Sequence, residues 1–294
     1  MRFILVILLL CSIGAQGQII NASPFYKPYV SACSYLLDQY SGAAAAYSLR
    51  LLDCQYAGSA IRVRRSSDNT ESDIGFVNGN LDTASLKAFV GTGGSDDGFV
   101  TVWYSQTGSN NISQSTAANQ PLIIDNGVVV RYNNLPTIRF DGVTGINADF
   151  FNANSLTGIS VLDIYMVHST SDNSYIHFYN INNGASFSYV ATSGSTNTLF
   201  RLDFGSPSLY TNNSLQSISN RGDAYTAMNG YKLIVMQGAA TTASSNWGGN
   251  FKIGGYATGF EFSGNISEMI FYNSDKSESR TSIQSNINTY YSVY

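Results

Sequence analysis

Short apolar runs, separated by turn residues, carry the hydrophobic pattern of this chain. The runs are rich in β-branched and aromatic side chains, and Asn-Gly and Asp-Gly pairs stand between many of them. They span residues 60–64, 99–104, 127–132, 137–140, 160–168, 174–179, 186–191, 198–204, 231–237, 251–253 and 264–272. Many short strands joined by tight turns predict a β-sandwich or jelly roll rather than a parallel α/β fold.

Polarity alternates within one of these runs, residues 162–167. Leu162, Ile164 and Met166 share one face of an extended strand, whereas the intervening face is mixed because it includes Asp163. The run therefore predicts a strand in a sheet whose two faces are both partly covered.

Two segments have the pattern of helices. A short helix is predicted near residues 83–90, which Asp82 can cap at its start and a glycine can end. A C-terminal helix is predicted near residues 275–290, where Ile283 and Ile287 recur at the helical period. We therefore expect an all-β sandwich with two helices, the second docked on a sheet.

The composition favours the same fold class. The chain has 20 Tyr, 16 Phe and 27 Gly residues, and only 12% of its residues are charged. Aromatic residues prefer strands and glycines prefer turns, so this composition indicates strands joined by turns rather than helices.

The N-terminal residues have the pattern of a signal peptide. Arg2 precedes a mostly apolar run from Phe3 to Ile13, and small and polar residues follow up to Gly17. This run is well short of the roughly 20 apolar residues that span a bilayer as a helix. We expect residues 1–17 to be removed, no membrane span, and residues 18–294 to form one secreted, extracellular domain.

The charge of the chain argues against a nucleic-acid partner. The formal net charge is −4, and the basic residues cluster only at Arg62, Arg64 and Arg65. Binding to nucleic acid depends on many cations that contact phosphates, so this class of function is excluded.

Cysteines and sequons fit an exported protein. After loss of Cys11 with the signal peptide, Cys33 and Cys54 remain, and they indicate one disulfide, with two buried thiols as the alternative. Asn-x-Ser sequons occur at four positions, namely Asn21, Asn111, Asn212 and Asn265. Their use depends on a host that glycosylates in its secretory pathway.

Several stretches, taken in order, resemble the catalytic domain of fungal α-L-arabinofuranosidase B and its relatives. The resemblance rests on residues 45–50, 61–69, 73–76, 102–108, 139–142, 253–255 and 282–291. It covers nearly all of the chain after residue 17 and implies a concanavalin A-like or laminin-G-like β-sandwich.

The resemblance also implies a retaining glycosidase, which needs a carboxylate nucleophile and a carboxylic acid about 5 Å apart. In the family the nucleophile is a Glu on a central strand, and the acid is an Asp directly after a Gly-Gly pair. Here the Glu residues are at positions 71, 261, 268 and 278 alone, and Tyr256 follows Gly254-Gly255. The vicinal cysteine pair of the family's sugar pocket is also missing. The sequence therefore argues against catalysis by the family's own residues, and it predicts no catalytic residue.

Displaced carboxylates could still satisfy the chemistry. Asp163, Asp172, Asp203 and Asp223 lie in the second half of the chain and are candidates for such a pair. The alternative is that these aspartates form turns with nearby backbone N–H groups.

Sugar binding without cleavage requires less of the sequence. Trp247 and Tyr256 are candidate glycan contacts, because exposed aromatic faces with polar neighbours suit sugar rings. The alternative is that both side chains pack in the interior.

No metal site or cofactor is predicted. His168 and His177 are the only histidines, so the ligand set for zinc is incomplete, and hydrogen-bonded strand histidines are the expected interpretation.

The leading functional hypothesis is a secreted non-catalytic β-sandwich that binds glycans or serves as a surface or structural component. The alternative is a glycoside hydrolase of α-L-arabinofuranosidase type with relocated carboxylates. Polysaccharides or glycoprotein glycans are the expected partners, and the sequence leaves the oligomeric state open.

Overall fold

A computed structural model describes residues 33–142, 148–156, 161–170, 172, 174–182, 185–197, 207–239, 251–255 and 261–294. Contacts group Ser34–Tyr294 into one compact unit, apart from Met1–Cys33. The signal peptide expected at residues 1–17 and the strand expected at 198–204 lie outside the described residues. In the described part of the chain, no helix has the length and apolar character needed to cross a bilayer.

The described structure has far more strand than helix. The helices are α1 (Leu36–Gln39), α2 (Thr83–Val90), α3 (Arg221–Met228) and α4 (Arg280–Tyr291), with 3₁₀ turns η1 (Ala117–Asn119) and η2 (Asn154–Leu156). The first strands are β1 (Ala43–Ser48), β2 (Ile61–Arg65), β3 (Glu71–Ile74), β4 (Phe76–Val77), β5 (Asn80–Leu81), β6 (Gly98–Trp103), β7 (Ile112–Ser113), β8 (Leu122–Asp125), β9 (Val128–Val129), β10 (Arg131–Tyr132) and β11 (Leu135–Pro136). The later strands are β12 (Ile138–Asp141), β13 (Phe151–Asn152), β14 (Asp163–Thr170), β15 (Ser174–Asn182), β16 (Ala185–Thr192), β17 (Ser208–Thr211), β18 (Ser214–Leu215), β19 (Gly230–Gln237), β20 (Phe251–Ile253) and β21 (Ser263–Tyr272).

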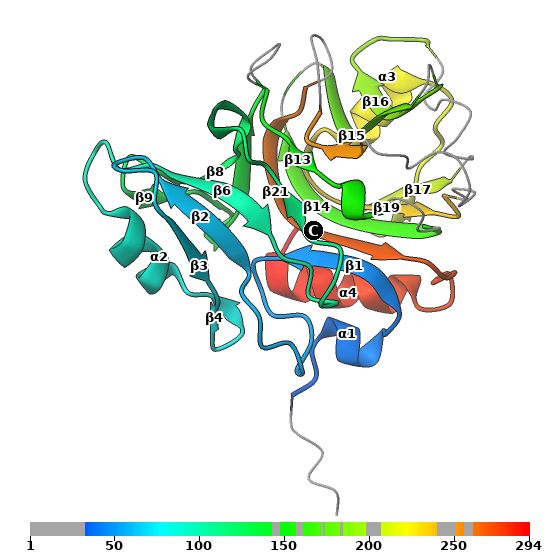
Figure 1. Ribbon diagram of the computed structural model, residues 1–294. Coiled ribbons are helices and arrows are strands. Elements are labelled where there is room, and N and C mark those ends of the chain that lie inside the picture. The colour runs from blue at the N-terminus through cyan, green and yellow to red at the C-terminus, as the bar shows by residue number, and fades with distance from the viewer. Residues whose placement is uncertain are drawn as a thin grey trace, which may run out of the picture. The chain divides into compact units, whose positions relative to one another are not determined.

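The strands pair antiparallel and form two facing layers. One layer runs β17, β19, β14, β21 and then β1 and β12, with β21 between β14 and the last two. From β12 the pairing passes through β8 to β6, and from β6 through β7, β13 and β20 to β15 and β16. The second series returns over the first (Figure 1). The predicted all-β sandwich is confirmed.

The space between the two layers holds the larger hydrophobic core. Ile164 and Met166 of β14 contribute from one layer, and Phe151, Phe251 and Ile253 contribute from the other. All five side chains are buried. Their burial removes apolar surface from water, which is the main term that holds such layers together.

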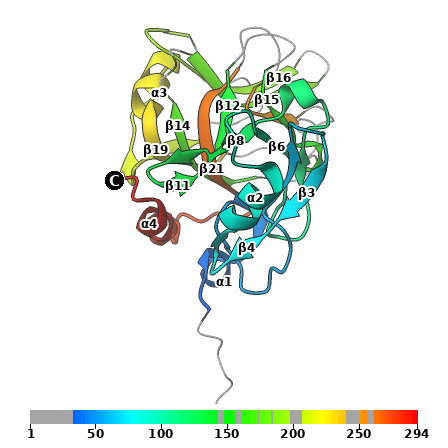
Figure 2. The same ribbon diagram turned by 90° about the vertical axis from the view of Figure 1, so that its left-hand side faces the viewer.

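A second hydrophobic core lies on the opposite face of β14, β19 and β21. Tyr165 and Val167 of β14 point into it, and α4 covers it with Ile283, Ile287 and Tyr291. Figure 1 shows α4 outside the sheet and next to α1, and Figure 2 shows the same helix after a quarter turn. The predicted docking of the C-terminal helix on a sheet is confirmed.

Both faces of β14 are covered, and more completely than the pattern predicts. Every residue from Asp163 to Thr170 is buried, because α4 covers the face that the sequence pattern marked as mixed. Asp163 tolerates this position because both of its carboxylate oxygens accept backbone hydrogen bonds.

The helices agree with their local signals. Asp82 caps α2 and accepts a hydrogen bond from the Ser85 backbone N–H at 3.0 Å. Helix α4 begins at Arg280, later than predicted, because Asp275 instead accepts from the Ser277 N–H in a turn. The pattern does not predict β1, an alanine-rich strand, because alanine has a low strand preference.

Candidate functional site

Two aspartates, Asp141 and Asp149, are in contact where β12 ends. The Asp141 backbone N–H donates to Asp149 Oδ2 at 3.0 Å, and the two carboxyl groups also hydrogen-bond to each other. Asp141 is exposed, whereas Asp149 keeps only 7% of its surface exposed. One carboxyl group of the pair therefore faces solvent and the other lies inside the protein.

The two groups cannot both ionise easily. Burial, together with the negative charge of Asp141, raises the pKa of Asp149 to about 8. The Asp141 N–H and the Arg139 charge act in the opposite direction but are outweighed. At neutral pH Asp149 consequently keeps its proton.

The chain directly after β20 packs closely against the residues of this pair. Gly254 has a φ of 98°, and a Cβ at that position would lie 2.4 Å from the Phe140 ring and 3.0 Å from the Asp149 carbonyl oxygen. Only glycine allows this approach. The Asp141–Asp149 pair therefore lies beside Gly254-Gly255. This is the segment after which the resemblance to arabinofuranosidases leads us to expect a catalytic acid.

The pair can supply one proton donor but not a complete hydrolytic site. Retaining and inverting glycosidases hold their two carboxyl groups about 5 Å or more apart, so that the sugar or a water fits between them. Asp141 and Asp149 are in direct hydrogen-bond contact, which is too close for that arrangement. A second carboxylate would have to come from elsewhere in the chain.

Two of the predicted displaced carboxylates have structural roles. Asp163 accepts hydrogen bonds from the Gly238 and Lys276 backbone N–H groups at 2.9 and 2.7 Å. Asp223 caps α3 and accepts from the Ser219 and Asn220 N–H groups. These aspartates follow the alternative interpretation as turn and cap formers.

The other two predicted carboxylates, Asp172 and Asp203, remain candidates for a displaced catalytic carboxylate. Asp172 is half-buried, and its N–H donates to Thr170 Oγ1. Asp203 lies outside the described residues, and so do the candidate glycan contacts Trp247 and Tyr256.

The four glutamates occupy different settings. Glu71 on β3 and Glu278 before α4 are exposed, and Glu268 is buried in an ion pair with Arg50. Glu261 forms an isolated antiparallel bridge with Gly255, on the segment next to the aspartate pair. Of the four, Glu261 is therefore the nearest along the sheet to the candidate site.

His168 has the structural role expected from the sequence. It is fully buried on β14, its Nε2 lies 2.8 Å from the Met228 carbonyl oxygen, and its ring stacks on Phe262. Burial lowers the pKa of His168 to about 4, which keeps the ring neutral at neutral pH.

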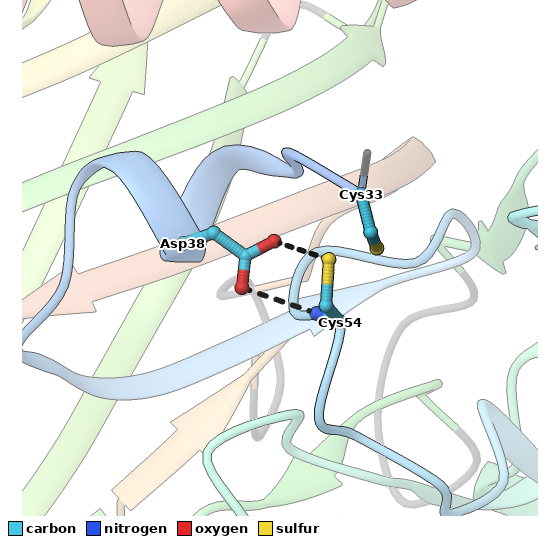
Figure 3. Close-up of side chains that lie close together, drawn as sticks. All are labelled: Cys33, Asp38 and Cys54. Atoms are coloured by element: carbon cyan, nitrogen blue, oxygen red, sulfur yellow. Dashed lines mark hydrogen bonds between the residues drawn. The ribbon is translucent and has the colours of Figure 1, made fainter. Parts of the chain in front are cut away.

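The predicted disulfide between Cys33 and Cys54 is confirmed. The Cys54 sulfur lies 2.7 Å from one oxygen of Asp38, and the other oxygen accepts the Cys54 backbone N–H at 3.2 Å (Figure 3). Two cysteines and an aspartate could in principle hold a metal ion, but the disulfide leaves no thiolate for one.

Loss of this disulfide is expected to destabilise the fold. Replacing Cys33 and Cys54 together with serine should lower the free energy of unfolding by about 2 to 4 kcal/mol, because the unfolded chain regains the freedom of the closed loop. Urea unfolding curves of the wild type and the double variant would measure the change. Wild type unfolded in excess reductant is the control and should match the variant, whereas equal midpoints with and without the disulfide would contradict the expectation.

Three of the four predicted sequons are in described segments. Asn111 is exposed before β7, Asn212 lies in the turn between β17 and β18, and Asn265 is on β21, where its Nδ2 donates to Ser169 Oγ at 3.0 Å. Asn21 lies outside the described residues.

Sequence reasoning missed the Asp141–Asp149 pair. Asp141-Gly142 reads as a turn signal, and nothing in the sequence indicates that residue 149 returns to it. The signal that could have drawn attention to it is Asp141 at the end of a strand that the family resemblance includes.

Comparison with known proteins supports the fold. No family model and no curated protein matches the chain by sequence. The crystal structure of an arabinofuranosidase complexed with arabinofuranosyl-α-1,2-xylobiose is 15% identical, with a TM-score of 0.52, over 83% of this chain and 62% of that chain. A GH54 α-L-arabinofuranosidase soaked with a cyclic sulfate inhibitor is 14% identical, with a TM-score of 0.49, over 86% of this chain and 64% of that chain. This chain thus spans less than two thirds of those structures, and at these identities the likeness concerns architecture alone: the chain has an arabinofuranosidase-like β-sandwich fold.

Proposed function

We propose that the protein is a glycoside hydrolase of arabinofuranosidase type in which Asp149 supplies the catalytic acid. The observation that carries the proposal is a largely buried carboxyl group, Asp149, in contact with the exposed Asp141 and beside Gly254-Gly255. A solved structure with the same fold holds an arabinofuranosyl-substituted xylobiose, which supports arabinofuranosyl side groups as the substrate class.

The chemistry needs a carboxylic acid that is still protonated at the working pH. Asp149 meets this need, because burial and the neighbouring charge of Asp141 raise its pKa to about 8. When Asp149 gives its proton to the leaving oxygen, the Asp141 N–H remains in place to stabilise the new carboxylate. Asp172, Asp203 and Glu261 are the first residues to substitute in the search for the nucleophile or base.

Turnover of a chromogenic α-L-arabinofuranoside tests the proposal. Asp149→Asn keeps the size of the side chain but cannot donate an acidic proton, so kcat should fall by about 10² to 10⁴. The control is Asp53→Asn, because Asp53 only accepts the Gln55 N–H in a turn and an amide can do the same. Wild-type activity should also fall as the pH rises through about 8, where Asp149 loses its proton.

A second candidate is the non-catalytic glycan-binding or structural protein. It is favoured by the sequence itself, which has no Glu from residue 72 to residue 260 and a Tyr after Gly254-Gly255. Saturable binding of arabinose-containing oligosaccharides without any turnover, unchanged in Asp149→Asn, would favour a glycan-binding protein. If the protein shows neither binding nor turnover, a role as a structural component would be favoured. All three proposals place the protein outside the cell, after cleavage of its N-terminal signal.

A further inference from the structure

A second hollow, built from other residues than the aspartate pair, lies where β3, β6 and β7 meet. Its volume is about 360 Å³. Its lining includes Tyr56, Ser59, Asp73, Tyr104 and Asn111. Two aromatic rings with a carboxylate and an amide are the chemistry that binds sugars.

A separate and larger hollow, of about 440 Å³, lies at the start of β14. Asp163, Gln237 and Asp275 form part of its lining. Its carboxylates already accept backbone N–H groups, Asp163 from Gly238 and Lys276 and Asp275 from Ser277. We call the smaller hollow, of about 360 Å³, the tyrosine hollow.

Hydrogen bonds hold the walls of the tyrosine hollow in place. The Tyr104 hydroxyl donates to Asp73 Oδ1 at 2.8 Å, and Arg62 donates to both oxygens of Asp73, each at 2.8 Å. The Tyr56 hydroxyl donates to the Ser59 carbonyl oxygen at 2.8 Å. Gly58 makes room for this ring, because a Cβ there would lie 2.5 Å from the Tyr56 hydroxyl. The two rings are therefore fixed before any ligand arrives.

Asn111, the first residue of the sequon Asn111-Ile112-Ser113, lines the same hollow. Its Oδ1 accepts the Ser105 backbone N–H at 3.0 Å, and its carbonyl oxygen accepts the Ser155 hydroxyl at 2.8 Å. Among the described residues, Asn111 Nδ2 has no hydrogen-bond partner. This is the atom to which sugar is attached in N-linked glycosylation. A glycan on Asn111 would consequently begin at the edge of the tyrosine hollow.

The other two described sequons differ from Asn111 in these respects. Asn265 is within β21, and its Nδ2 donates to Ser169 Oγ. Asn212 is in a tight turn with a φ of 49°, and its Oδ1 accepts the Leu233 N–H. Neither of them lines the tyrosine hollow.

We propose that Asn111 carries an N-linked glycan whose first sugars rest in the tyrosine hollow, against Tyr56 and Tyr104. The proposal depends on export through a glycosylating secretory pathway and is independent of the proposed hydrolase activity. Covalent attachment matters because an open hollow with few contacts binds a separate sugar weakly, whereas a tethered sugar is present at an effective concentration in the millimolar range.

The attachment step uses an oligosaccharide that the host supplies as a lipid diphosphate. Asn111 Nδ2 attacks the anomeric carbon, the new C–N bond forms, and the anomeric C–O bond breaks. The lipid diphosphate leaves with that electron pair, and the amide gives up one proton.

Secretion from glycosylating eukaryotic cells provides the test. Ser113→Ala removes this sequon without changing Asn111, and Ser214→Ala removes the Asn212 sequon in the same way, as a matched control at another exposed serine. Peptide mass spectrometry should find sugar on Asn111 in the wild type. Ser113→Ala should lower Tm by about 2 °C, the scale of a modest loss of stability in a domain of this size, and Ser214→Ala should leave it unchanged.

A second pair of proteins separates contact with the tyrosines from attachment alone. In a Tyr104→Leu background, Ser113→Ala should no longer change Tm, and an endoglycosidase should release the Asn111 glycan from the native protein faster than from the wild type. Tyr56→Leu gives the same comparison if Tyr104→Leu does not fold.

Three results would overturn the proposal. They are an unmodified Asn111, a Ser113→Ala effect that persists unchanged without Tyr104, and binding of a free monosaccharide to the unglycosylated protein with a Kd well below about 1 mM. The last result would make the tyrosine hollow a receptor for external sugars.

Discussion

Glu268→Gln is expected to lower the free energy of unfolding by about 3 to 5 kcal/mol, because it leaves a buried guanidinium without its counter-charge. Glu268 is 1% exposed and accepts two hydrogen bonds from Arg50, at 2.8 and 3.0 Å. Ser48 donates to the same carboxylate at 2.7 Å, and the Tyr291 hydroxyl of α4 lies 3.3 Å from it. Burial acts to lower the pKa of Arg50, but the charge and hydrogen bonds of Glu268, together with Tyr290 and Tyr291, outweigh it, and the pKa is raised.

Denaturant unfolding of matched variants measures this effect. The exposed Arg62–Asp73 pair has the same two-point geometry, so Asp73→Asn is the control and should cost no more than about 1 kcal/mol. An Arg50→Met, Glu268→Leu double variant should recover much of the loss, since a buried pair can often be exchanged for apolar side chains. A loss for Glu268→Gln as small as that for Asp73→Asn would mean that the buried charge is relieved in some other way.

Asp149→Asn is expected to stabilise the protein at alkaline pH and to leave it nearly unchanged below about pH 4. With its pKa raised to about 8, Asp149 keeps its proton in the folded protein, whereas the unfolded chain releases it near the ordinary pKa of 3.8. Between these two values the folded state binds more protons, so wild-type stability falls as the pH rises. At about 1.4 kcal/mol per pKa unit, the loss above pH 8 reaches up to about 6 kcal/mol.

The groups that face Asp149 are Asp141 and Arg139, and neither is altered in the variant. The measurement is the difference in unfolding free energy between Asp149→Asn and the wild type at pH 4, 7 and 9. Taking the difference matters because buried His168 has the opposite effect: its pKa of about 4 in the folded state makes stability fall as the pH drops below its unfolded value. A difference that stays constant with pH would show that Asp149 is ionised in the folded protein across this range.

Local signals in the sequence predict α2 and α4 but not α1 and α3. Asp82 and Gly91 define α2 because a cap and a C-terminal glycine act on neighbouring backbone groups. The pattern does not predict α3, although Asn220 and Asp223 have capping-box spacing that could have been recognised. Helix α3 has a weak apolar periodicity, because only Ala224 and Met228 of this helix are buried. The hydrophobic pattern therefore does not indicate it.

The candidate site depends on contacts that the sequence pattern does not encode. Asp141 and Asp149 meet because the chain returns after β12, and the raised pKa of Asp149 depends on how deeply that side chain is buried. Similarly, Arg50 and Glu268 are 218 positions apart, and neither has a neighbour in sequence that reveals the pairing. The absence of Glu from residues 72–260, in contrast, can be seen in the sequence directly.

The position of β21 constrains how the molecule can be made. This strand lies between β14 on one side and β1 and β12 on the other, although it is almost the last element to be synthesised. Until residue 272 has left the ribosome, three earlier strands present unpaired edges that can capture other nascent chains. Such long-range pairing also closes slowly, so we expect yields to depend on chaperones and on translation speed near the end of the message.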